Sequence, residues 1–300
     1  MKVLVLHSLP PVNLAGRAAT EFDLAAAAQD IADVLPGAVV AGVRGDINEI
    51  LDVLKAHDPD VVFNTCEAPL GRPDLEPHVA ALLEWLGVPF TGSGSETLAL
   101  CRRKDRTKAV LASAGVPVPR ANVLPCIVKP VDEDGSAGIC LDSVCEDEAA
   151  RDGAIARLGR PALVEEFLPG REFAVSLWGR TRPEFSSLME TRFRNGLRLN
   201  TYASKWDEDS DEFTNSPHAY SIDMGPELRA AVFAAAVESW KAVGARGYLT
   251  VDVRLDGSER PFVLDVNPNS DLGPGVGIVR AAEEIGWTWE RFVRQQVEWA

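Results

Sequence analysis

Long hydrophobic runs, paired cysteines and basic residues are all scarce in this sequence, and each scarcity excludes a class of protein. The N-terminal apolar run Val3 to Leu6 is much shorter than a signal-peptide core, and no segment approaches the roughly 20 apolar residues needed to span a bilayer. The five cysteines show no CxxC spacing, which argues against a disulfide framework and a zinc site. Lys and Arg number 30 against 45 Asp and Glu, and the net charge of −15 argues against nucleic acid as a partner. We therefore expect a cytoplasmic protein that binds neither membrane nor nucleic acid.

The remaining composition is that of an ordinary globular protein. With 300 residues, 46% of them hydrophobic, the chain is long enough for two or three sub-domains. Its first part alternates the apolar, strand-length runs KVLVL, AVVAGV and DVVFN with segments of helical pattern. This alternation predicts a parallel sheet in an N-terminal β/α domain over residues 1–91.

The pattern changes after residue 91. Two short helices that end near Gly115 precede the strand-like segments CIVKP and ALVEEF, which predict an α+β central sub-domain over residues 92–168. The third block, residues 169–300, contains a long helix from Pro226 to Val243 and the strands GYLTVDVRL and PFVLDVN. An amphipathic helix from about Trp289 closes the chain. The predicted fold class is α/β, with two α+β sub-domains after the N-terminal domain.

A lysine at a strand end is the first candidate for chemistry. Lys129 ends CIVKP and precedes the small-residue turn Asp132 to Gly138, where backbone N–H groups can approach phosphate oxygens. A charged hairpin is the alternative, because this is not a Walker motif. The densest basic cluster lies between Arg102 and Lys108, where a solvated helix face is the alternative.

Two adjacent predicted strands carry oxygen ligands. Asp252 lies inside one strand, while Asp265 and Asn267 share a face near the end of the next. Two carboxylates and an amide oxygen suit Mg²⁺, which retains few protein ligands when phosphates complete its shell. The alternative is a strand end capped by an Asn-Pro turn.

Five sequence blocks occur in a fixed order: VVFN with VAALLEWLGVPFTGSG, KDRTKAVLASAGVPVP, IVKPVDEDGSAGI, LVEEFLPGREFAV, and VDVRLD with PFVLDVNPN. This order resembles the D-alanine–D-alanine ligase family of ATP-grasp enzymes from Asp60 to the C-terminus, and TYASKW and TNSPHA resemble its mobile active-site loop. The resemblance implies an ATP-grasp fold and an ATP-dependent ligase that joins a carboxylate to an amine through an acyl phosphate, with release of ADP and phosphate. Small-molecule substrates, amino acids among them, are expected.

The resemblance also implies roles for particular residues. The nucleotide phosphates would be contacted by Lys104 and Lys129, the ribose by Glu172, and the adenine by Glu165, Glu166, Phe167 and Leu168. Two Mg²⁺ ions, with Mn²⁺ as the alternative metal, would be held by Asp252, Asp265 and Asn267. The expected catalytic set consists of Lys205 over the γ-phosphate, Glu21 on the donor amine, and Ser136 in the small-residue turn. Family members are commonly homodimers, although no exposed apolar stripe here requires a dimer.

Several positions depart from the family pattern. Thr250 stands where an arginine is usual, Asp265 replaces a glutamate, Gly135 replaces a serine, and Trp206 replaces a tyrosine. Cys66 and Glu67 occupy the place of a His-Gly pair. These changes lie mostly around the amino-acid pockets, so we expect D-alanine to be a poor substrate and Glu67 to favour an additional cationic group.

Two other functions agree with parts of the sequence. A degenerate ATP-grasp module with a regulatory or interaction role is favoured by Thr250 and Asp265, whereas retention of both phosphate lysines opposes it. An NAD-dependent oxidoreductase would agree with the N-terminal β/α units, but no GxGxxG follows the first strand.

Overall fold

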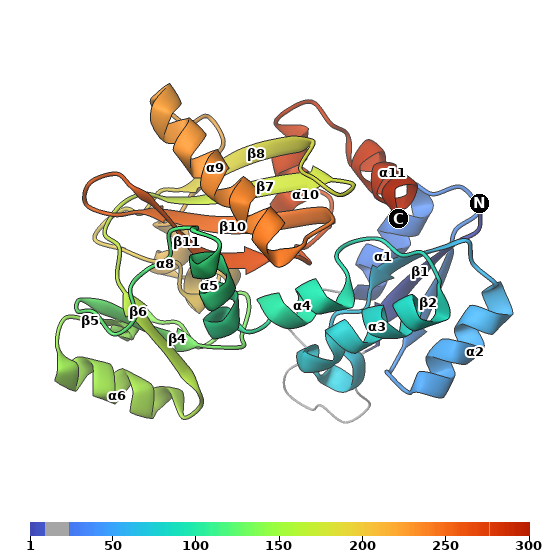
Figure 1. The fold of residues 1–300 in the computed structure, drawn as a ribbon, viewed down its shortest axis with the longest axis horizontal. Helices are drawn as coiled ribbons and strands as arrows, with labels where there is room; N and C mark the ends of the chain where they lie inside the picture. The colour runs from blue at the N-terminus through green and yellow to red at the C-terminus, as the bar shows by residue number, and fades with distance from the viewer. Residues whose placement is uncertain (10–23, 276) are drawn as a thin grey trace.

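The computed structural model describes residues 1–9, 24–275 and 277–300, which are organised around three sheets (Figure 1). The first sheet is parallel, in the order β2-β1-β3, as the alternation of strand and helix predicted. Its elements are β1 (Val3–Ser8), α1 (Leu24–Asp33), β2 (Val39–Val43), α2 (Ile47–His57), β3 (Val61–Thr65) and α3 (Glu76–Leu86). The strands β1 and β3 are buried along their whole length because helices cover both faces of a parallel sheet.

A smaller antiparallel sheet in the order β5-β4-β6 follows two short helices. The elements are α4 (Ser95–Cys101), α5 (Lys104–Ser113), β4 (Cys126–Pro130), β5 (Val144–Cys145), α6 (Glu148–Leu158) and β6 (Ala162–Glu166). α6 packs on this sheet through Ala154, over a small core that includes Cys126 and Val128. Lys129 lies at the end of β4, as the sequence predicted.

The largest sheet is antiparallel, in the order β11-β10-β7-β8-β9. Its strands are β7 (Glu172–Gly179), β8 (Phe185–Thr191), β9 (His218–Ala219), β10 (Gly247–Leu255) and β11 (Pro261–Asn267). The helices of this part are α7 (Tyr202–Trp206), α8 (Asp211–Thr214), α9 (Pro226–Val243), α10 (Gly277–Glu283) and α11 (Trp289–Trp299). The predicted bounds of α9, β10 and β11 are confirmed, since Gly and Pro mark where these apolar segments begin or end.

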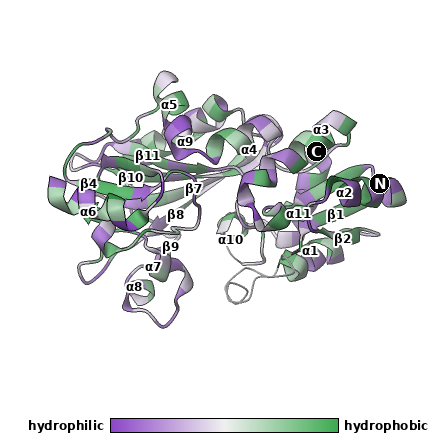
Figure 2. Ribbon diagram, turned by 90° about the horizontal axis from the view of Figure 1, so that it is seen from below, coloured by the Kyte–Doolittle hydropathy of each residue, from purple (hydrophilic) through white to green (hydrophobic). Residues whose placement is uncertain are grey.

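The two faces of the large sheet differ in chemistry. Leu249, Val251 and Val253 of β10 are buried in the core shared with α9, because alternate side chains of a strand point to one face. The other face of β10 carries Tyr248, Thr250, Asp252 and Arg254. Figure 2 shows α5 and α9 on one side of the sheet, and α7 and α8 on the other. The polar face of β10 is therefore available for a site.

The C-terminal helix returns to the N-terminal sheet. Phe292 and Val293 of α11 are buried in one core with Val3 and Ile31, and Figure 1 shows the C-terminus beside α1. Within the described residues, no helix is long and apolar enough to cross a membrane. The division at residues 91 and 168 stays a prediction, because α4 and α5 also pack on the core of the large sheet through Cys101 and Leu111.

Candidate functional site

The polar side chains of β10 face those of its two neighbours. Asp252 lies opposite Asp265 of β11, Thr250 lies opposite Asn267, and Arg254 lies opposite Glu172 of β7. The register of the sheet thus places the residues expected to hold metal and ribose along one polar stripe.

Lys104 joins this stripe from the first residue of α5. Its buried Nζ is 2.5 Å from Asp265 Oδ2 and 3.2 Å from Asp134 Oδ1. Burial opposes ionisation of Asp265, but the positive charges of Lys104 and Lys129 lower its pKa below the ordinary value. Two lysines that are distant in sequence therefore share one electrostatic environment with the expected metal ligand.

Lys129 is part of a buried triad of charges. Lys129 Nζ lies 2.5 Å from one carboxylate oxygen of Glu165, and Lys108 Nζ lies 2.8 Å from the other. Burial opposes ionisation of Glu165, yet the two lysines keep its pKa below the ordinary value. Burial also lowers the pKa of Lys108 to about 8, although Glu165 opposes that change. No role was predicted for Lys108, although its position one helical turn after Lys104 places the two side chains on one face.

Glu172, the expected ribose ligand, is held from two sides. Arg254 donates through Nη1 to Glu172 Oε2 at 2.8 Å, and Asn200 donates to Oε1 at 2.7 Å. The buried guanidinium of Arg254 lies 4.9 Å from the ring centre of Phe167 and 5.3 Å from that of Phe193. Sequence reasoning missed Arg254, although its position two residues after Asp252 places both side chains on the same face of β10.

The other residues expected near adenine follow β6. Phe167 and Leu168 are buried, and the Phe167 N–H donates to the Pro125 carbonyl at 2.8 Å. Glu166 instead faces outward, where it accepts Arg120 Nη2 at 2.6 Å. Neighbouring glutamates of one strand thus point to opposite environments, as the two-residue period of a strand requires.

Asp252 has no direct partner within the described part of the chain. Burial raises its pKa to about 6, while the positive charge of Lys205 opposes the increase. Asn267 is exposed, and its Oδ1 accepts the Asn269 N–H at 2.9 Å. The described residues contain no group of three or more His, Cys, Asp and Glu side chains arranged to hold a metal ion.

The segment that resembles a mobile loop contacts the turn after Lys129. Trp206 donates through Nε1 to the Gly135 carbonyl at 2.8 Å, and the Tyr202 N–H donates to the Ile139 carbonyl at 3.1 Å. Gly135 and Ser136 both have positive φ, +61° and +62°, so the backbone of the turn is left-handed there. Lys205 on α7 is exposed. Glu21 lies outside the described residues.

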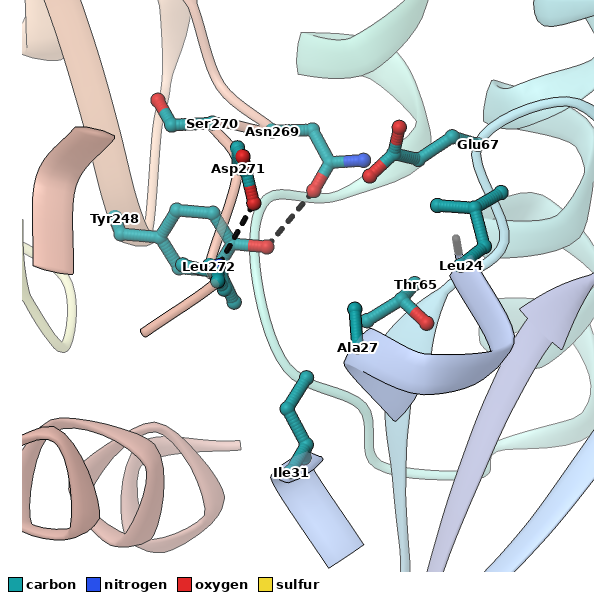
Figure 3. A pocket seen from close by; sticks show the side chains of 11 residues that line it. Leu24, Ala27, Ile31, Thr65, Glu67, Tyr248, Asn269, Ser270, Asp271 and Leu272 are labelled. Carbon is teal, nitrogen blue, oxygen red and sulfur yellow. Dashed lines mark hydrogen bonds between the residues drawn. The ribbon is translucent and has the colours of Figure 1, made fainter. Parts of the chain in front are cut away.

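A cavity opens between the N-terminal unit and the large sheet (Figure 3). Thr65 and Glu67 line it from the end of β3, and Tyr248, Asn269 and Asp271 line it from β10 and the segment after β11. The Tyr248 hydroxyl donates to Asn269 Oδ1 at 2.8 Å. Asn269 follows the expected metal ligand Asn267 by two residues, so the cavity adjoins the polar stripe.

Comparisons with known proteins identify the family. The D-ala D-ala ligase C-terminus family model matches residues 99–298. A D-alanine–D-alanine ligase of Desulforudis audaxviator is 31% identical over 275 residues, which cover 85% of this chain and 86% of that protein. One from Gluconobacter oxydans is 29% identical and covers 91% of this chain and 90% of its own length.

A solved structure shares the fold. The D-alanine–D-alanine ligase of Bacillus anthracis, complexed with ATP, superimposes with a TM-score of 0.72 at 18% identity, over 99% of this chain and 96% of that one. At that identity the likeness establishes the fold alone. It confirms the predicted fold class, and the sequence matches confirm the family that the five blocks implied. The chain therefore belongs to the D-alanine–D-alanine ligase family of ATP-dependent, ATP-grasp ligases.

Proposed function

We propose that this chain joins a carboxylate to an amine through an acyl phosphate, with ATP converted to ADP and phosphate. The observation that carries the proposal is the meeting of Lys104 with Asp265 at 2.5 Å, beside Lys129 and opposite Asp252. Phosphoryl transfer depends mainly on positioning and charge compensation, which the lysines and the half-buried carboxylates supply. The ATP-bound Bacillus anthracis ligase, which shares the fold, supports ATP as the nucleotide.

The chemistry assigns a task to each of these groups. A carboxylate oxygen of the donor attacks the γ-phosphorus and ADP leaves, while Lys104 and Lys129 offset the negative charge of the phosphates. The amine nitrogen of the acceptor then attacks the acyl carbon, phosphate leaves, and the nitrogen loses a proton. Lys205 on α7 approaches the γ-phosphate, and the loop that carries it excludes the water that would hydrolyse the acyl phosphate.

The residues on β10 and β11 fit a hard divalent cation. Asp252 is a carboxylate without a protein partner in the described residues, and burial raises its pKa to about 6, so a cation beside it would restore its charge. Asp265 and Asn267 add a carboxylate and an amide oxygen. Mg²⁺ usually takes one or two carboxylates and completes its shell with phosphates and water, so this small set is sufficient. When bound, Mg²⁺ would neutralise phosphate charge during transfer.

The remaining roles stay proposals on the strength of the family resemblance. Glu172, oriented by Arg254, would bind ribose. The adenine would lie near Phe167 and Leu168, with Glu165 and Glu166 at the same strand end. Ser136 and Glu21 would contact the donor. Amino acids are the proposed substrates, and a homodimer and a cytoplasmic location stay predictions.

Stimulated ADP formation tests the proposal. A panel of amino acids and small carboxylates is incubated with ATP and Mg²⁺, and each product is identified by mass spectrometry. We expect at least one pair to stimulate ADP release and to yield an amide, with D-alanine a poor substrate, because Thr250 cannot replace an arginine beside a developing oxyanion. If ATP binds but no carboxylate or amine stimulates its cleavage, the chain is a nucleotide-binding module rather than a ligase.

A further inference from the structure

The cavity next to the polar stripe is lined by carboxylates that lack a cation. Within the described residues, the Glu67 carboxylate makes no hydrogen bond and no ion pair, and Figure 3 shows it facing Asn269 across the cavity. Asp271, on the opposite wall, accepts the backbone N–H of Gly273 at 2.7 Å and has no cationic partner in the same part of the chain. Two acidic groups from different units of the fold thus face the same cavity.

Asn269 fixes the geometry of this space. Its Oδ1 accepts the hydroxyl of the buried Tyr248 at 2.8 Å, and its Nδ2 donates to Glu76 Oε1 at 2.5 Å. The protein itself therefore uses the Asn269 oxygen and one oxygen of Glu76. Among the described residues that line the cavity, the carboxylate oxygens without a hydrogen-bond partner are those of Glu67 and the second oxygen of Asp271.

The missing counter-charge affects the ionisation of these groups. Burial, followed by repulsion from Glu76, Asp271 and Asp134, raises the pKa of Glu67 to about 8. Burial raises the pKa of Glu76 to about 7, although its hydrogen bond with Asn269 opposes the increase. A cation in the cavity would favour the ionised form of each carboxyl group, because opposite charges at short range lower the pKa of an acid.

We propose that this cavity binds a protonated amino group at the far end of the substrate, distinct from the α-amino group and from the groups that react, and that Glu67 selects for it. This inference rests on the ligase function proposed above. Asp134, which repels Glu67, is also the partner of Lys104 at 3.2 Å, so the cavity lies close to the phosphate-binding lysine. The ammonium group would bind between Glu67 and Asp271, and the reacting carboxylate would extend toward Lys104. The substrate class is a diamino acid, or a carboxylate with an amino group at its far end.

Pairs of compounds that differ only in charge test this inference. The pairs are 2,4-diaminobutyrate with norvaline, ornithine with norleucine, and 4-aminobutyrate with pentanoate, with both enantiomers where they exist. For the full-length protein we measure kcat/KM from ADP formation and, separately, Kd by calorimetry. At least one cationic member should be preferred by about tenfold or more, because hydrogen bonds between charged groups are the stronger ones.

Variants assign the preference to the cavity. Glu67→Gln keeps the shape but removes the charge, and the preference should fall to about twofold or less, as the loss of a charged hydrogen bond predicts. Asp271→Asn should weaken it in the same direction and provides a second variant if the first does not fold. Asp74→Asn is the matched control, because Asp74 lies on the same unit outside the cavity and pairs with Arg72 at 2.6 Å. The control should keep the full preference.

The two readouts separate the inference from the function on which it rests. One outcome is that a cationic member binds more tightly, that Glu67→Gln loses this preference, and that no compound stimulates ADP formation. This outcome supports the cation-binding cavity and contradicts the ligase function. Stimulated ADP formation with equal kcat/KM and Kd within every pair upholds the ligase and overturns the cavity. Preferences that persist unchanged in both cavity variants, or the absence of binding by any cationic member, also overturn it.

Discussion

Two neighbouring glutamates at the end of β6 allow a matched test of the buried charge triad. Glu165 is almost fully buried between Lys108 and Lys129, at 2.8 and 2.5 Å, whereas Glu166 pairs with the exposed Arg120. Glu165→Gln leaves two buried ammonium groups without their counter-charge, and removing one partner of a buried pair typically costs about 3–5 kcal/mol. Glu166→Gln removes an exposed pair, which is worth about 0–1 kcal/mol.

The contacts of the triad set the expected magnitude. Lys108 also donates to the Val263 carbonyl at 3.2 Å, and its pKa of about 8 allows it to release a proton once Glu165 is replaced. Both effects limit the loss, so we expect about 3 kcal/mol, the lower end of the range for a broken buried pair. Urea unfolding of both variants and the wild type at pH 7, followed by circular dichroism, measures the difference. The two ranges are separated by about 2 kcal/mol, so the reasoning is wrong if the two substitutions cost the same within about 1 kcal/mol.

Three further predictions concern catalysis, nucleotide binding and pH. Asp252→Asn should reduce turnover at least about tenfold, since it removes a charge that compensates phosphoryl transfer; normal turnover with an intact circular dichroism spectrum would exclude Asp252 from the mechanism. Arg254 contacts Glu172 at 2.8 Å, so Arg254→Met leaves Glu172 without this partner. The variant should raise KM for ATP more than it lowers kcat, and Arg254→Lys should partly restore KM. An unchanged KM contradicts this role. Burial and neighbouring carboxylates raise the pKa of Glu67 from 4.5 to about 8. Between pH 4.5 and pH 8 the folded protein therefore keeps a proton that the unfolded chain releases, and the free energy of unfolding falls as the pH rises. Glu67→Gln should therefore match the stability of the wild type near pH 4.5 and exceed it by a few kcal/mol at pH 8, since each pKa unit corresponds to about 1.4 kcal/mol. Equal unfolding free energies of the two proteins at both pH values contradict this prediction.

Local sequence was sufficient for much of the fold. The helix from Pro226 to Val243 and the strands β10 and β11 were predicted at their observed bounds, because apolar periodicity and flanking Gly or Pro residues specify such elements locally. The two-residue period of a strand also predicted that Asp265 and Asn267 share a face. The order of the motif blocks indicated the family that the comparisons identified.

Contacts between distant segments required the tertiary structure. The family resemblance places Glu165 beside adenine, and that role stays a prediction. Only the fold shows that Glu165 also lies between Lys108 and Lys129, and Lys108 had no predicted role. Arg254 reaches Glu172 only because β10 and β7 pair in one register. A shift of one residue in that pairing would turn either side chain to the opposite face of the sheet.

Local patterns were enough to predict the later strands and helices, the family, and the residue types available for phosphate and metal. Which charges neutralise one another, and which have no partner within the described residues, as is the case for Asp252 and Glu67, follows from the fold. Ionisation and hydrogen bonding depend on burial and on neighbours within a few ångströms, and those neighbours come from strands and loops far apart in the chain.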